Sequence, residues 1–89
     1  MIPHDAWLPV PLCARHVLVG DVFVGKGGDL WLVSETSPHF IARRTADQMF
    51  SAPKIDPDTV IQVLVPVTER DALRLTRDEL GARLIERRT

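Results

Sequence analysis

The clearest pattern along the chain is the alternation of side chains from Thr59 to Val67, which predicts a β-strand. Ile61, Val63 and Val65 would share one face of that strand, because successive side chains point to opposite sides of a sheet. The run from Leu30 to Glu35 also predicts a strand, but it is apolar on both faces. We therefore expect a sheet with a helix lying over the outer face of one of these two strands.

Further strands are predicted on both sides of the second run. Val17 to Val24 is rich in β-branched and aromatic residues, with a kink at Gly20-Asp21. Gly25 to Asp29 is a glycine-rich link of hairpin type, since glycine adopts positive φ without strain. Shorter strands are expected at Phe40 to Arg44 and at Thr45 to Phe50. The side chains expected to be mostly buried are Leu18, Phe23, Trp31, Val33, Ile61 and Val63.

The two ends of the chain differ from this β-rich middle. The first twelve residues carry Pro3, Pro9 and Pro11, so we interpret them as an extended arm rather than a central strand. Toward the other end, Thr68 can cap a helix, and Thr76 with Glu79 forms a second capping box. One continuous helix and two shorter helices are both compatible with this pattern. The expected organisation is a single small domain over 1–89, with an arm at 1–16, a sheet or barrel at 17–67 and a helix or helix pair at 68–88.

The hairpin carries a family resemblance, because Val-Gly-Asp-x-Phe leads through the glycines to Trp-x-Val. In this, Val17 to Ser34 resembles the opening of SH3-like small barrels. It is also similar to the KOW-type hairpin of ribosomal and transcription-elongation proteins as far as Gly28, where bulky residues replace the usual small and basic ones. The expected fold class is mainly β with C-terminal α, as a small bent antiparallel sheet or SH3-like barrel of four to five strands. The arginine-rich style also resembles uncharacterised accessory proteins of actinobacterial phages, which implies a host-directed binding protein or a minor structural subunit of a phage particle.

Charge and composition narrow the environment more than the function. A formal net charge of −1 provides no overall attraction to nucleic acid or to an anionic membrane. No apolar run approaches the roughly 18 residues that would span a bilayer. The lone Cys13 fits a reducing compartment. We therefore expect a cytoplasmic protein, in the host cytoplasm if the chain is phage-encoded, with no membrane partner.

Residues with catalytic or metal-binding chemistry do not converge in the sequence. Cys13 and His16 have a plausible ligand spacing, but His4 and His39 are isolated from them, whereas a structural zinc site needs four ligands. The glycines from Gly25 to Gly28 link two strands and do not open a helix, which is not the arrangement of a phosphate-binding loop. We therefore expect no enzyme activity, no metal and no cofactor.

Binding is the remaining class of function, and one patch of residues suggests where it could occur. His39, Phe40, Arg43 and Arg44 place cations beside an aromatic ring, and the neighbouring sequence does not evidently neutralise the two arginines. The preferred hypothesis is a non-enzymatic protein-interaction module that uses an exposed sheet edge or the N-terminal arm. The alternatives are a nucleic-acid or transcription-associated small barrel and a minor structural subunit of a phage particle. A small enzyme or toxin nuclease ranks last, and the oligomeric state is open.

Overall fold

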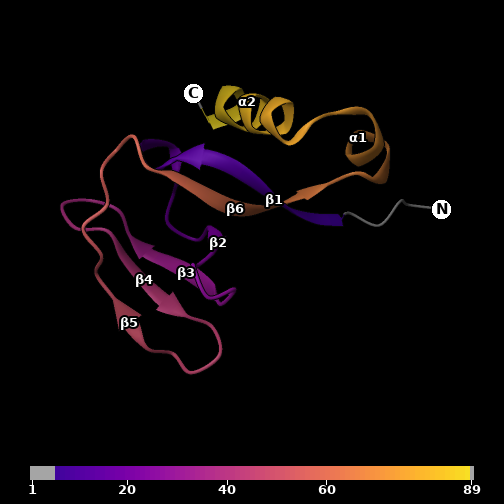
Figure 1. Ribbon diagram of the computed structural model, residues 1–89. Coiled ribbons are helices and arrows are strands. Elements are labelled where there is room, and N and C mark those ends of the chain that lie inside the picture. The colour runs from indigo at the N-terminus through magenta and orange to yellow at the C-terminus, as the bar shows by residue number, and fades with distance from the viewer. Residues whose placement is uncertain (1–5, 89) are drawn as a thin grey trace.

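The computed structural model describes residues 6–88, in which an antiparallel sheet is followed by two C-terminal helices (Figure 1). The strands are β1 (Ala6–Cys13), β2 (Val22–Val24), β3 (Leu30–Glu35), β4 (Ile41–Arg44), β5 (Phe50–Ser51) and β6 (Val60–Val67). The helices are the 3₁₀ turn η1 (Ala14–His16), α1 (Glu69–Arg74) and α2 (Arg77–Arg88). The order β1-β6-β2-β3-β4-β5 leaves β1 and β5 at the two edges of an open sheet. The predicted class, mainly β with a C-terminal helical segment, is confirmed, with six described strands instead of four or five.

The additional strand comes from the segment that we interpreted as an arm. β1 pairs with β6 along its whole length, and Pro9, Pro11 and Pro66 all fall in the same alternating set of pairs. Proline has no N–H, so the hydrogen bonds between these strands must run through the other set. The backbone bond from the N–H of Ala14 to the carbonyl of Thr59, at 2.8 Å, continues that other set. The prolines are therefore compatible with a strand at the sheet edge.

The second strand is shorter than predicted, because a turn replaces its first half. The backbone N–H of Leu18 donates to the carboxylate of Asp21 at 2.8 Å, and Gly20 has a φ of 95°. This local hydrogen bond competes with strand pairing and turns the chain immediately before β2. Leu18 is consequently 49% exposed, so the prediction that it is buried is wrong. The glycine-rich hairpin that follows joins β2 to β3 as expected.

The strand predicted from Thr45 to Phe50 is also wrong in most of its length. The N–H of Gln48 donates to the carbonyl of Arg44 at 2.9 Å, and Gln48 has a φ of 64°. The carboxylate of Asp47 accepts a further hydrogen bond from the N–H of Met49 at 3.2 Å. These contacts form a tight turn after β4, so only the last residue of the predicted strand belongs to β5.

The hydrophobic core lies on one face of the sheet. Phe23, Val33, Ile61 and Val63 are buried, as predicted, and Trp31 is partly buried against them. The other buried apolar side chains are Val10, Leu12, Val17, Ala42, Val65, Val67 and Leu80. The strand register places the sheet members on the same side, because directly paired residues share a face. The opposite face of the sheet is the outer face.

The C-terminal segment forms two helices with a break between them. The backbone N–H of Glu79 donates to the hydroxyl of Thr76 at 3.2 Å, and the N–H of Thr76 donates back to the Glu79 carboxylate at 3.4 Å, which is a reciprocal capping box. α2 packs against β1 and adds Leu80 to the core cluster, so the prediction that the helix covers the outer face is wrong. Gly81 permits this approach, since a Cβ there would lie 2.9 Å from the carbonyl oxygen of Pro11.

The end of α2 is fixed by one ion-paired arginine. The Arg88 guanidinium donates to both carboxylate oxygens of Asp21 and to the backbone carbonyl of His16, each at 2.8 Å. The Arg88 and Asp21 side chains are 18% and 14% exposed. A bidentate, largely desolvated pair of this kind is geometrically specific, so it holds α2 in one orientation over the sheet.

Candidate functional site

His39 and Phe40 do not form an exposed aromatic platform. His39 is exposed in the loop before β4, whereas Phe40 is partly buried and packs against the core. The ring centroids of Phe40 and Phe23 are 5.9 Å apart, with the rings tilted by 57°. Both predicted residues line a groove with Lys54 and Ile55, but the Phe40 ring is already engaged in core packing.

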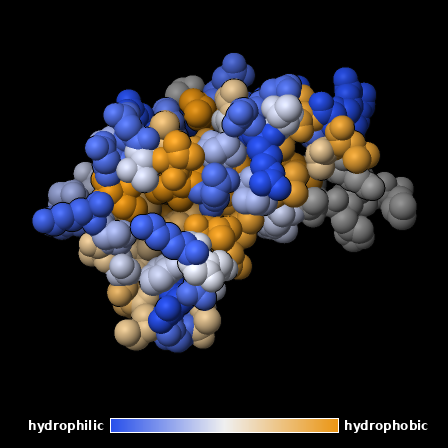
Figure 2. Space-filling view, viewed as in Figure 1, coloured by the Kyte–Doolittle hydropathy of each residue, from blue (hydrophilic) through white to orange (hydrophobic). Residues whose placement is uncertain are grey.

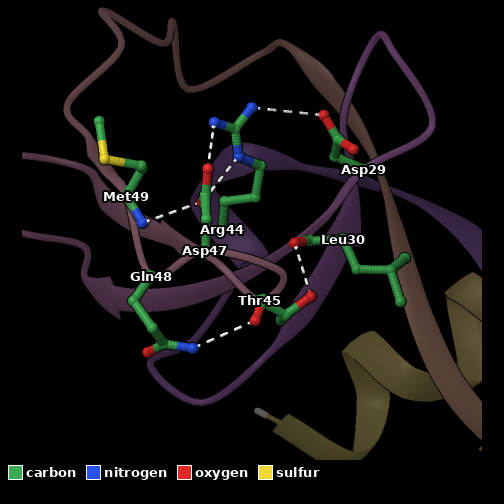
Figure 3. Close-up of polar contacts among 7 residues, drawn as sticks. All are labelled: Asp29, Leu30, Arg44, Thr45, Asp47, Gln48 and Met49. Carbon is green, nitrogen blue, oxygen red and sulfur yellow. Dashed lines mark hydrogen bonds and ion pairs between the residues drawn. The ribbon is translucent and has the colours of Figure 1, made fainter.

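Arg44 is ion-paired with neighbouring carboxylates, contrary to our expectation that the neighbouring sequence does not neutralise its charge. Its Nε and Nη2 donate to Asp47 at 2.9 and 2.7 Å, and its Nη1 lies 3.6 Å from the Asp29 carboxylate (Figure 3). The guanidinium carbon also lies 5.5 Å from the centroid of the Trp31 ring. Arg44 therefore joins the β2–β3 hairpin to the turn after β4, which is a structural role.

The electrostatics of this pair follow from the same hydrogen bonds. The hydrogen bonds from Arg44 lower the pKa of the Asp47 carboxyl below its ordinary value, and the N–H of Met49 acts in the same direction. The hydrogen bond to Asp47, together with the negative charge of Asp47, raises the pKa of Arg44. Both groups thus remain charged at neutral pH and satisfy each other.

Arg43 has the opposite environment, because consecutive strand residues point to opposite faces. It is paired across the strands with Leu32 on β3 and with Phe50 on β5, so it lies on the outer face. The register continues this row from Leu32 to Val22 on β2. Among the side chains that the structure describes, none forms a hydrogen bond or an ion pair with the Arg43 guanidinium. Arg43 is therefore a cation without a described partner in an otherwise apolar row.

The apolar row ends at an exposed aromatic side chain on the edge of the sheet. Phe50 is 65% exposed and Met49, immediately before it, is 57% exposed. A shallow groove adjoins this edge; it is lined by Ser34, Glu35, Ile41, Phe50, Ser51 and Ala52. We define the β5 surface as Leu32, Ile41, Arg43 and Phe50, which share the outer face beside this groove.

Other parts of the surface give weaker indications of a binding site. On the face drawn in Figure 2, hydrophilic side chains predominate over the upper, helical part, and apolar side chains reach the surface in separate patches. In the groove beside His39, Arg15 is already paired with Asp58. The β5 surface differs from both, because it combines an exposed aromatic ring, a cation without a described partner and a free strand edge.

The structure gathers no metal-binding cluster in its described part. Cys13 ends β1 and His16 ends η1, but across residues 6–88 no three His, Cys, Asp or Glu side chains are placed to share a metal ion. His4 lies outside the described residues.

Neither α1 nor α2, the α-helices in the described range, has the length and apolar character needed to cross a membrane.

Sequence reasoning missed Phe50 as a surface residue, because the surrounding segment was interpreted as an ordinary strand. A signal was present: Arg44 and Asp47 are three residues apart, which suits a turn but places their side chains on opposite faces of a strand.

Comparison of the chain with protein family models, with curated proteins and with solved structures finds no match.

Proposed function

We propose that this chain is a non-catalytic interaction module that binds a partner protein through the β5 surface. The observation that carries the proposal is Phe50, an aromatic side chain that is 65% exposed at the free edge of the sheet, whereas Trp31 on β3 packs against the core. Aromatic side chains and arginines are enriched at protein–protein interfaces, and Phe50 is paired across the strands with Arg43.

The alternative function, binding of nucleic acid, loses support from the same geometry. The expected patch needed both arginines and the Phe40 ring, but Arg44 is bound to Asp47 and Phe40 packs against Phe23. One remaining cation neutralises about one phosphate, which provides little affinity at physiological salt. The proposed partner is accordingly a protein, and the resemblance to phage accessory proteins makes host proteins the first group to examine.

The proposal is tested by placing a photo-crosslinking phenylalanine analogue at position 50 in the chain expressed in actinobacterial cells. The matched control has the analogue at Leu73, which is 83% exposed on α1. We expect one discrete adduct with another polypeptide from position 50 and none from position 73. The purified partner should then bind the wild-type chain and bind Phe50→Ser about ten-fold or more weakly.

Two outcomes would contradict the proposal. Equal adducts from both positions, or none from either, would show that position 50 is not a contact site. Salt-sensitive binding of single-stranded nucleic acid that Arg43→Ala abolishes would favour the alternative function, because release of counterions makes phosphate contacts strongly dependent on salt.

A further inference from the structure

The hydrogen-bond pattern at β5 shows which backbone groups of this edge are free. The N–H of Arg44 donates to the carbonyl of Met49 at 2.8 Å, so this residue pair is hydrogen-bonded. Bonded and non-bonded pairs alternate in an antiparallel ladder, which makes Ala42 and Ser51 the next bonded pair and leaves Phe50 between them. The N–H and C=O of Phe50 therefore point away from β4.

No described residue satisfies these two outward groups. The backbone bonds outside regular strand pairing do not involve Phe50 within residues 6–88. The next residue on the same side is Ala52, and Pro53 then ends the series of donors. The free edge is thus short, and its exposed backbone is bordered by the Phe50 side chain and by the groove that contains Ile41.

From this geometry we infer that the β5 edge accepts an extended segment of the partner protein as an added strand. The inference rests on the proposed function and specifies its mode of recognition. The outward N–H and C=O of Phe50 would exchange two backbone hydrogen bonds with the incoming strand, as in other cases of strand addition. An apolar side chain of that strand would cover the Phe50 ring, since side chains of paired residues lie on the same face.

Charge defines the chemistry of the added segment more closely. Arg43 lies one strand in from the edge, on the same face as Phe50, and no described carboxylate neutralises it. The added strand would lie two strand spacings, about 10 Å, from β4, a distance that an extended Arg side chain and an extended acidic side chain can span together across β5. The expected ligand is therefore an extended peptide segment with alternating apolar residues and at least one Asp or Glu.

The test is selection of short linear peptides from a random library on the immobilised full chain, followed by backbone methylation of the best binder. Strand addition predicts that the effect of methylation alternates along the peptide with a period of two residues. Amides that face β5 donate hydrogen bonds to it, whereas the amides between them point away from β5. Methylation at alternate positions should weaken binding about ten-fold or more, and methylation between them should have little effect. Arg43→Ala should weaken binding of acidic peptides and not of their Asn or Gln versions.

Amide hydrogen exchange provides the second measurement, on the protein side. The Phe50 amide should exchange rapidly in the free chain and become protected with the peptide bound, whereas the Ser51 amide, which faces β4, should change little. If the peptide binds and requires the Phe50 side chain but the Phe50 amide remains unprotected, strand addition is wrong and the proposed function stands. If no peptide is selected and position 50 forms no crosslink, the proposed function and strand addition are both wrong. If position 50 crosslinks to a second copy of the chain, the β5 surface mediates self-association and does not bind a different protein.

Discussion

The two edges of the sheet, β1 and β5, are treated in opposite ways. On β1, Pro9 and Pro11 remove two of the outward N–H groups, and α2 approaches so closely that Gly81 lies against the Pro11 carbonyl. On β5, the outward backbone groups of Phe50 have no described partner and no described helix covers the strand; an exposed aromatic ring occurs at both edges, since Trp7 is 63% and Phe50 65% exposed. Proteins commonly protect edge strands against unwanted pairing with prolines and covering elements. Under the proposed function, one edge is largely closed by the fold and the other is the edge that a partner would use.

The largest expected effect concerns the closed edge. Leu12 on β1 is 1% exposed and belongs to the core cluster, so Leu12→Ala should lower the free energy of unfolding by about 2 to 5 kcal/mol. Urea or thermal unfolding of the purified variant measures this change. A loss below about 1 kcal/mol would mean that β1 is an accessory strand after all, and the contrast between the two edges would fail.

The next effect concerns the contact that fixes α2 over the closed edge. Arg88→Ala should cost about 1 to 3 kcal/mol of unfolding free energy, because it leaves the largely buried Asp21 carboxylate without its cation. Arg87→Ala is the matched control, since Arg87 is exposed one residue earlier on the same helix, and it should change stability by less than about 0.5 kcal/mol. Equal effects of the two variants would show that the pair with Asp21 does not hold the helix.

A smaller, pH-dependent effect is expected in the turn that leads to the open edge. Folding lowers the pKa of Asp47, so its ionised form stabilises the fold. That contribution is complete above the ordinary Asp pKa of about 3.9 and is lost as the pH falls below it. Asp47→Asn should therefore lower the melting temperature slightly at neutral pH, and the difference should shrink in acid. If the difference in melting temperature between the wild type and Asp47→Asn stays constant with pH, the charge of Asp47 is not the cause of the effect.

The smallest expected effect is on the open edge itself. Phe50→Ser should change the free energy of unfolding by less than about 0.5 kcal/mol, because the ring is already 65% exposed in the folded chain. Circular dichroism and a thermal melt would measure this. A loss comparable with that of Leu12→Ala would mean that Phe50 is part of the core and that its exposure does not mark a binding surface.

The elements that were predictable from sequence are those specified by side-chain alternation or by glycine. The strand from Leu30 to Glu35, most of the strand before Val67 and the hairpin between β2 and β3 follow from these local patterns. For the strand before Val67 the burial follows as well, since Ile61 and Val63 occupy the face that the alternation assigns to the core.

The elements that were missed depend on contacts that alternation does not reveal. The Asp21 carboxylate converts half of a predicted strand into a turn, and Asp47 does the same after β4. The role of β1 was missed because prolines argue against a strand unless their missing donors all point outward, which only the register with β6 decides. The contacts of two residues in the predicted binding patch were missed in the same way, since Phe40 packs against Phe23 and Arg44 is hydrogen-bonded to Asp47.

The pairing of β1 with β6 also has a consequence for the order of synthesis. β1 is the first described strand to leave the ribosome, and its partner is the last, so β1 must wait while the intervening strands are made. A waiting apolar strand is exposed to pairing with wrong partners, and contacts between distant segments form slowly. Because of the prolines at positions 9 and 11, only one side of the β1 backbone can donate a regular series of hydrogen bonds. That side is the one that pairs with β6. The same two residues that close the finished sheet thus reduce the number of wrong partners available to the nascent chain.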